Sequence, residues 1–408
     1  MAKNPIIKVD HPEDEESIPI IAKHGALFIN ALKCLLRNPV RSSIVILCLI
    51  ALLTPFVTAM AICEGVKSQY TKILNQAGDV YVARDNYGSN APIELEMIEH
   101  LKEIQGVTEV VPRVIGRTYV KGKFLAVLGI DPEHTPSSIR LVRGRMPKGN
   151  GDVIMGREAA KFLKLKIGSR FSIKRNPGQV FQIVGLFKSP CNIWNVDLLM
   201  MSYEDASVLF GIRGMATDLS VYTRPGYEQI VDIIVRLSEK EEESGKPTLR
   251  VQTKELIDRY SQRGFNIKAG VFAGLYCLVL TLGIPSIGVI SGFGFSERRR
   301  EIGVMKALGW QTQEILEMTA LENLVLGILS VPFIIIAAVL WIHLFNGAVI
   351  AKFFIASLDI IIPFQVPSKV FPIPAMLGLM MAVILAMVGS IYSTWRTATV
   401  PPSEAMKT

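Results

Sequence analysis

Few residues in this 408-residue sequence have the types and spacing that a chemical site requires. His100, His134 and His343 stand alone, and the sequence contains neither an H-E-x-x-H metal motif nor a G-x-S-x-G nucleophile turn. The five cysteines are scattered without a C-x-x-C pair. Packing thiols are therefore expected, with a Cys63–Cys191 disulfide as a minor alternative. The pattern predicts a chain without a catalytic or metal site of its own.

A phosphate-binding loop is missing as well. The Walker A loop, G-x-x-x-x-G-K-[ST], holds ATP phosphates with its backbone N–H groups and its lysine, and this sequence lacks it. The run Gly292-Phe293-Gly294 lacks the third glycine and the preceding strand of a dinucleotide loop. We therefore expect no enzymatic activity and no cofactor in this chain.

The most informative stretch is 296–316, SERRREIGVMKALGWQTQEIL. After the charged run ERRRE, a 3.6-residue period places Ile302, Met305 and Leu308 on one helix face, and Gly309 interrupts the pattern. Arginines alone would suffice for an anchor that fixes membrane topology. An exposed apolar ridge suits a surface that docks into another protein. Both interpretations are open at this level.

The remaining composition is that of a membrane protein. Half of the residues are hydrophobic (50%), only 20% are charged, and the mean hydropathy is +0.36. Four apolar segments, each long enough to cross ~30 Å of hydrocarbon, are expected at 43–63, 269–293, 318–345 and 373–392. A net charge of +8 without a nucleic-acid motif indicates membrane lipids, not nucleic acid, as partners.

Basic residues in the short flanks of these segments predict the orientation. Lys33 and Arg37 precede the first segment, residues 298–300 separate the second from the third, and Arg396 follows the fourth. Both termini are therefore expected in the cytoplasm. The first segment starts too late and is too long for a cleaved signal peptide, so it is expected to be an anchor.

The expected organisation follows from these spans. In chain order it comprises a flexible cytoplasmic tail (1–24), an interfacial amphipathic helix (25–42), the first span (43–63), an extracytoplasmic domain (64–268), the second span (269–293), a cytoplasmic coupling loop (294–317), the third span (318–345), a short extracytoplasmic loop (346–372), the fourth span (373–392) and a cytoplasmic tail (393–408).

The long polar segment between the first two spans predicts an α+β domain. Residues 79–83 alternate as a strand, 92–104 as a helix, and Lys121-Gly122 marks a hairpin turn. Glycine- and proline-rich short strands follow from 141 to 210, and a strand–helix–strand pattern returns after 216. The expected fold class is thus a four-helix membrane part plus an α+β domain (64–140 and 211–268) with an inserted β-rich subdomain (141–210).

The charged stretch resembles the cytoplasmic coupling segment of FtsX/MacB-like ABC-transporter permeases. In that family, E-R-x-R-E-I-G and, two or three residues later, A-L-G precede the third membrane helix. The matching residues here are Glu297, Arg298, Arg300, Glu301, Ile302, Gly303, Ala307, Leu308 and Gly309. The resemblance implies that these residues, together with Met305 and Lys306, couple the permease to an ATPase.

Further stretches resemble the same family. GRMPKGNGDVIMG and LKIGSRFSI…FQIVGLF are similar to parts of the MacB-like extracytoplasmic domain, and the tail carries the family's short Pro-x-E-A pattern at Pro402, Glu404 and Ala405. The resemblance implies a permease in the inner (cytoplasmic) membrane. Its partners would be a cytosolic ABC ATPase that binds ATP and Mg²⁺, a second permease copy in a homo- or heterodimer, and, for some members, a periplasmic adaptor.

The function implied is mechanotransmission: ATP hydrolysis by the separate ATPase moves the extracytoplasmic domain, for export of a drug, peptide or other small substrate. One alternative is a permease that releases lipoproteins from the membrane. Another is a non-transporting regulator of an extracytoplasmic cell-wall hydrolase. A membrane receptor without an ATPase would leave the apolar ridge unexplained.

Overall fold

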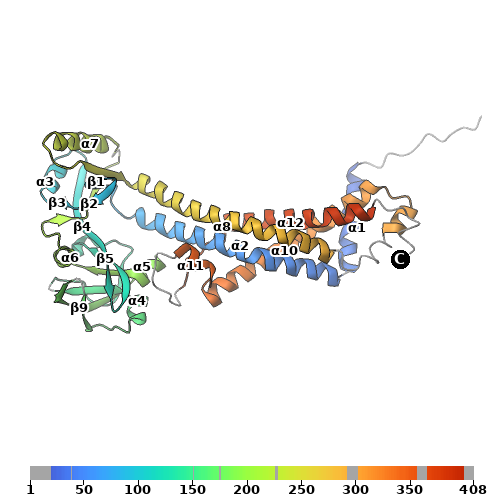
Figure 1. The fold of residues 1–408 in the computed structure, drawn as a ribbon, viewed down its shortest axis with the longest axis horizontal. Coiled ribbons are helices and arrows are strands. Elements are labelled where there is room, and N and C mark those ends of the chain that lie inside the picture. Colours follow the sequence, from blue (N-terminus) through green and yellow to red (C-terminus); the bar gives the residue numbers. More distant parts are fainter. Residues whose placement is uncertain are drawn as a thin grey trace, which may run out of the picture. The chain divides into compact units, whose positions relative to one another are not determined.

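The computed structural model describes residues 20–37, 39–149, 151–173, 176–225, 228–291, 302–355 and 365–398 (Figure 1). They fall into two compact units. The helical unit comprises Met1–Leu53, Cys277–Ile334 and Leu377–Thr408, and the mixed unit comprises Thr54–Tyr276 and Ile335–Met376. Each unit is described by itself.

Long apolar helices carry most of the membrane-type sequence. They are α1 (Ile20–Arg37), α2 (Pro39–Leu74), α8 (Lys254–Ser291), α10 (Thr312–Phe345) and α12 (Ile373–Ala398). Among the described residues, 3 helices are long and apolar enough to cross a membrane: Ser42–Leu74, Lys254–Thr281 and Thr312–Phe345. The fourth expected span falls in a shorter apolar helix, Ile373–Gly389. Helices α2 and α8 both extend beyond the first two expected spans into polar sequence, α2 to Leu74 and α8 from Lys254, as a helix that carries the chain off the membrane would.

Small and hydrogen-bonded residues shape the helical unit. A Cβ on Gly327 of α10 would lie 3.0 Å from the Val383 Cα atom of α12, so the two backbones approach closely there. Buried polar groups on α10 bond to its own carbonyl groups. Thr319 Oγ1 donates to the Ile315 carbonyl at 2.9 Å, and Ser330 Oγ donates to the Gly327 carbonyl at 2.7 Å. Such bonds satisfy donors that water does not reach.

An 11-stranded sheet in the order β13-β1-β12-β4-β5-β10-β7-β9-β6 forms the mixed unit, with β2 paired to β1 and β8 to β9; β11 and β3 form a separate pair. Most neighbours are antiparallel, but β10 runs parallel to β5 and β7 runs parallel to β9. The strands are β1 (Val80–Asn86), β2 (Ser89–Ala91), β3 (Ile93–Glu94), β4 (Val107–Val120), β5 (Lys123–Gly129), β6 (Arg140–Gly144), β7 (Asp152–Gly156), β8 (Arg170–Ile173), β9 (Asn176–Lys188), β10 (Leu198–Met201), β11 (Met215–Ala216), β12 (Asp218–Thr223) and β13 (Leu249–Thr253).

The helices of the mixed unit are short, apart from α7 (Glu228–Glu243) and the long helices that enter it. The short ones are α3 (Met97–Lys102), α4 (Arg157–Phe162), α5 (Asn192–Asp197), α6 (Tyr203–Phe210), α11 (Ile350–Ile355) and the 3₁₀ turn η1 (Pro132–His134). Around β1, β12 and β13, helices α3 and α7 close a core that includes Leu101 and Ile234. A larger core with Phe181 and Ile183 lies under the strands of the predicted insertion. The division at 141 and 210 stays a prediction.

Local expectations for this unit hold in part. The hairpin at Lys121-Gly122 is confirmed: both residues have positive φ, 47° and 78°, as a two-residue hairpin turn requires, and Val120 pairs with Lys123. The helix expected from residue 92 is wrong at its start, because Ile93 and Glu94 pair with β11, and α3 begins at Met97. All five cysteines are free, so the Cys63–Cys191 alternative is wrong.

Candidate functional site: the coupling segment and the helix contacts of the mixed unit

The described part of the coupling loop is a short helix followed by a tight turn. Residues 302–307 are helical. The Trp310 N–H donates to the Met305 carbonyl and the Gly309 N–H donates to the Lys306 carbonyl, both at 3.0 Å. This bond pair, with Gly309 at a φ of 94°, is a Schellman motif, which ends a helix on a left-handed residue. The break predicted at Gly309 is confirmed. We call residues 302–310 the coupling segment.

The chain restarts as α10 immediately after this turn. The Gln311 N–H donates to Glu314 Oε2 at 3.0 Å, so a glutamate in the first helical turn satisfies a backbone donor at the helix start. The glutamate charge also lies near the positive end of the helix dipole. Two local signals, a glycine stop and a glutamate start, therefore set the geometry between the coupling segment and α10.

Apolar packing holds the coupling segment against its own chain. Ile302 is 3% exposed and packs with Ile315 of α10, and Met305 and Trp310 are half-buried beside them. Met305 and Trp310 also contact a cluster formed by Ala31 of α1 and Met318 of α10. The turn at Gly309 brings the helix 302–307 back onto α10, and α1 covers the same cluster through Ala31.

The prediction of an exposed Ile302 is therefore wrong, and that of an exposed Met305 holds only in part. These apolar residues do repeat at a helical period. The face that they form is partly covered by α1 and α10 of the same chain. The large exposed apolar side chains of the coupling segment are those of Val304, at 46%, and Leu308, at 75%. Leu308 thus keeps the exposure predicted for it, and Val304 was missed because it lies off the predicted stripe.

The remaining predicted coupling residues divide by position. Gly303 is buried, Lys306 is half-exposed, and Ala307 and Gly309 are exposed. Glu297, Arg298, Arg300 and Glu301 lie outside the described residues. The role of all these residues in contacting an ATPase stays a prediction. Among the described residues of the motif, the structure brings Ile302 and Met305 together against α10.

Within the mixed unit, the end of α2 and the start of α8 pair along their length. Thr71 Oγ1 donates to Asp258 Oδ1 at 3.1 Å, and Cys63 Sγ lies 3.6 Å from the Phe265 carbonyl oxygen. Further along, the Phe56 and Tyr276 rings lie 5.3 Å apart. Phe56, Cys63 and Thr71 follow one another along α2, and their partners Tyr276, Phe265 and Asp258 lie progressively earlier in α8, so the two helices are antiparallel. Polar bonds near the sheet give way to aromatic contacts further away.

Asp79 joins both helices to the sheet. Lys254, the first residue of α8, donates from Nζ to Asp79 Oδ1 at 2.9 Å, and the Thr223 N–H of β12 donates to Asp79 Oδ2 at 3.0 Å. Burial by itself would raise the pKa of Asp79, but these hydrogen bonds and the Lys254 charge outweigh it and hold that pKa below its usual range. Asp79 is therefore an ionised anchor between α8, β12 and the turn after α2.

A loop after α11 packs against α2 and bonds to it. The sequence analysis did not predict this contact. In this 365–370 loop, the Lys369 N–H donates to the Ala61 carbonyl at 2.8 Å, and the Gln365 carbonyl accepts from Asn192 Nδ2 of α5 at 2.7 Å. A Cβ on Gly65 would lie 2.3 Å from the Ser368 Cα atom, so only glycine leaves room for the loop. The available signal was Gly65 itself, a glycine that follows the first apolar span by two residues and lies inside α2.

Sequence comparisons agree with this architecture. Residues 42–244 match the MacB-like periplasmic core domain, and residues 273–402 match the FtsX-like permease C-terminal domain. Over 237 residues, the chain is 24% identical to an uncharacterized ABC transporter permease, MJ1507, of Methanocaldococcus jannaschii. That match covers 53% of this chain and 58% of the relative, so the chain spans less than two thirds of the relative's length.

Solved structures give weaker likenesses. The extracellular domain of the noncanonic ABC-type transporter YknZ from Gram-positive bacteria has a TM-score of 0.33 at 17% identity, covering 43% of this chain and 100% of that domain. The periplasmic region of MacB from Actinobacillus actinomycetemcomitans has a TM-score of 0.35 at 15% identity, covering 46% of this chain and 95% of that region. Because both TM-scores are below 0.5, the family of this chain follows from the sequence matches and not from these two structures. The two matched domains together cover most of the chain, which belongs to the ABC-transporter permeases of the FtsX/MacB type.

Proposed function

We propose that this permease transmits the work of a separate cytosolic ATPase to its α+β domain. The ATPase docks at 297–309, and its closure on ATP moves the coupling segment together with α10. The ATPase partner, not this chain, binds ATP and Mg²⁺. The cargo is a drug, peptide or other small substrate that is exported from the membrane or from the space outside it.

One observation carries this proposal. The coupling segment is fixed to α1 and α10 through Ile302 and Met305, yet it leaves Leu308 75% exposed. Exposed apolar side chains on a rigid turn are typical of a protein contact. A surface that is held firmly from behind can pass a displacement to the helix on which it rests.

The mixed unit has a structure suited to receive a displacement of the long helices. Helix α2 ends six residues before β1 starts, and α8 begins directly after β13, so each helix passes into the sheet through a short connection or none. Asp79 adds a hydrogen bond at the start of α8, and the 365–370 loop adds one to Ala61 within α2. Helices that enter a sheet without a flexible linker are suited to act as levers on it.

The topology proposed for this function has four spans, with α12 as the fourth. The protein lies in the inner membrane. Both termini and the coupling segment face the cytoplasm, and the α+β domain lies on the opposite side of the membrane. Two permeases, identical or related, form the working dimer. For the export function, a periplasmic adaptor would dock at the α+β domain.

The test is purification of the tagged chain from detergent-solubilised native membranes, with identification of every co-purifying protein. We expect a protein with Walker A and Walker B motifs. The Leu308→Asp variant places a charge in an apolar contact and should reduce the recovered ATPase at least about tenfold, since a central apolar contact contributes ~2 kcal/mol or more. Val304→Asp should act in the same direction.

A matched control is Val142→Asp, which changes an exposed apolar residue of β6 in the mixed unit (47% exposed) and should leave ATPase recovery unchanged. Membrane insertion and protease resistance should be equal in all variants. Normal ATPase recovery with Leu308→Asp would refute the docking role. Recovery of an ATPase with a second permease and lipoproteins would favour lipoprotein release over export.

A further inference from the structure

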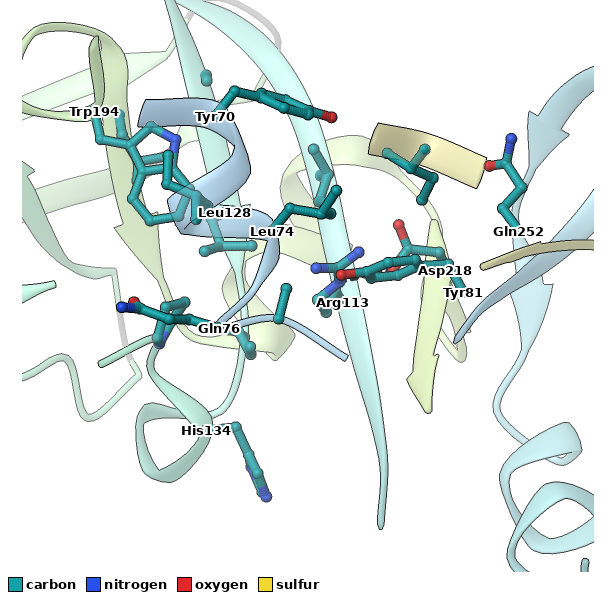
Figure 2. A pocket seen from close by; sticks show the side chains of 18 of the residues that line it. Tyr70, Leu74, Gln76, Tyr81, Arg113, Leu128, His134, Trp194, Asp218 and Gln252 are labelled. Carbon is teal, nitrogen blue, oxygen red and sulfur yellow. Dashed lines mark hydrogen bonds and ion pairs between the residues drawn. The ribbon is translucent and has the colours of Figure 1, made fainter. Parts of the chain in front are cut away.

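A cavity of about 340 Å³ lies in the mixed unit between the end of α2 and one face of the sheet (Figure 2). Its size falls in the range of small-molecule sites. Figure 2 shows Tyr70, Leu128 and Trp194 together on one side of the cavity, whereas Arg113 and Asp218 lie on another side. The cavity is therefore amphipathic: Gln76 and His134 add polar groups elsewhere in the lining, and we call the part around Arg113 and Asp218 its polar end.

The polar end is built on neighbouring strands. Arg113 of β4 stands opposite Asp218 of β12 in the sheet register, and Arg113 Nε donates to Asp218 Oδ1 at 2.8 Å. The guanidinium carbon lies 4.6 Å from the centre of the Tyr81 ring, close enough for a cation–π contact. Burial would lower the pKa of Arg113, but Asp218 outweighs it and raises that pKa, so the guanidinium stays charged.

This guanidinium has donors to spare. Arginine carries five N–H donors, and Asp218 binds through Nε. Tyr81 is a further hydrogen-bond partner, and burial raises the pKa of Tyr81 to about 12, so its hydroxyl stays protonated. Arg113 lines the cavity, and the planar fork of a guanidinium matches the geometry of a carboxylate. The side chain is 17% exposed and contributes to the lining of the cavity.

We propose that this cavity binds a small amphipathic carboxylate, with its carboxylate on the Nη edge of Arg113 and its aromatic or branched apolar body beside Trp194, Tyr70 and Leu128. Binding needs neither an ATPase nor a second permease, so the site goes beyond the proposed transport function and can be tested separately from it. A carboxylate at this place also bridges the sheet to the end of α2.

The test uses the full chain in nanodiscs and equilibrium dialysis, with empty nanodiscs as the blank. The probe is 4-phenylbutyrate, and 4-phenylbutanol has the same body without the charge. We expect one saturable site per chain for the acid and at least about tenfold weaker binding of the alcohol, because a charge-assisted hydrogen bond is lost. Equal binding of acid and alcohol would overturn the proposal. Tighter binding of 3-phenylpropylphosphonate would overturn the carboxylate assignment.

Two variants assign the site. Arg113→Lys keeps a positive charge beside Asp218 but removes the planar guanidinium. It should weaken binding of the acid about tenfold and have little effect on binding of the alcohol. Ala77→Trp adds a large side chain to the lining of the cavity from the turn after α2 and leaves both residues of the ion pair unchanged, so it should abolish binding of both probes. Val142→Trp, on exposed β6, is the control and should bind as the unmodified chain does. Unchanged acid binding in Ala77→Trp at equal protease resistance would place the ligand elsewhere.

Discussion

The mixed unit and the coupling segment use their side chains in opposite ways. In the mixed unit, Arg84 is 3% exposed, and its guanidinium donates to Glu241 at 2.7 Å, to Glu94 at 3.0 Å and to the Pro247 carbonyl at 2.7 Å. The coupling segment instead leaves Leu308 75% exposed. The charged group of Arg84 finds its partners within the chain, whereas the apolar side chain of Leu308 stays uncovered by it.

The difference indicates where each region obtains its stability. Buried ion pairs and a continuous sheet need no partner, so the mixed unit should resist unfolding by itself. The coupling segment rests on a few apolar contacts with Ala31, Ile315 and Met318, and it ends on a glycine turn. Substitutions in the first region should therefore change stability, whereas surface substitutions in the second should change partner binding.

The largest expected effect is at Arg84. The Arg84→Met change removes three hydrogen bonds of a buried guanidinium, two of them to carboxylates that are themselves partly exposed, and it should lower the free energy of unfolding of the mixed unit by about 3 kcal/mol. Pulse proteolysis in urea on the full chain measures it. Lys102→Met, which breaks an exposed pair with Glu99, is the control and should cost less than about 1 kcal/mol. Similar midpoints for the two variants would contradict the comparison.

Gly65 tests the grip of the 365–370 loop on α2. Gly65→Ala places a methyl group against the Ser368 backbone, and we expect a loss of about 1–3 kcal/mol from overpacking. Gly270→Ala, in α8, meets no atom within 4 Å and should instead gain up to about 1 kcal/mol from helix propensity. Thermal unfolding of both variants in nanodiscs measures the difference. Two stabilising changes would show that the loop moves aside.

Gly309 tests the turn that ends the coupling segment. Gly309→Ala meets no atom within 4 Å, so its cost is the left-handed backbone alone, about 1–2 kcal/mol. Local hydrogen exchange at residues 304–310 should rise about tenfold, since 1.4 kcal/mol is a factor of ten. Gly264→Ala in α8, which has a helical φ and open space, should leave exchange in the coupling segment unchanged.

The smallest expected effect concerns Asp79. Because its folded pKa lies below the unfolded value of about 3.9, its contribution is present above pH 4 and is lost as the pH falls through the folded pKa. Asp79→Asn should therefore lower stability by about 1 kcal/mol at pH 7 and by almost nothing near pH 2. Urea midpoints at both pH values measure this. A difference that persists at low pH would assign the effect to packing.

Local signals in the sequence predicted several features correctly. The apolar lengths of α2 and α10, the Lys121-Gly122 turn and the stop at Gly309 each depend on residues close together in the chain. The family motif likewise lies in one run, so its match required no folding. Apolar length, turn chemistry and a contiguous motif are properties of short windows, and a sequence displays them directly.

Only the tertiary structure decided which surfaces are covered. Ile302 and Leu308 belong to the same predicted stripe, yet Ile302 is buried by Ile315 and Leu308 is exposed. The contact of Gly65 with Ser368 joins residues far apart in the chain. The cavity at Arg113 likewise needs α2, β4 and β12 in one place. A helical period names a face, but the partner of that face comes from distant segments, so burial could not be read from spacing.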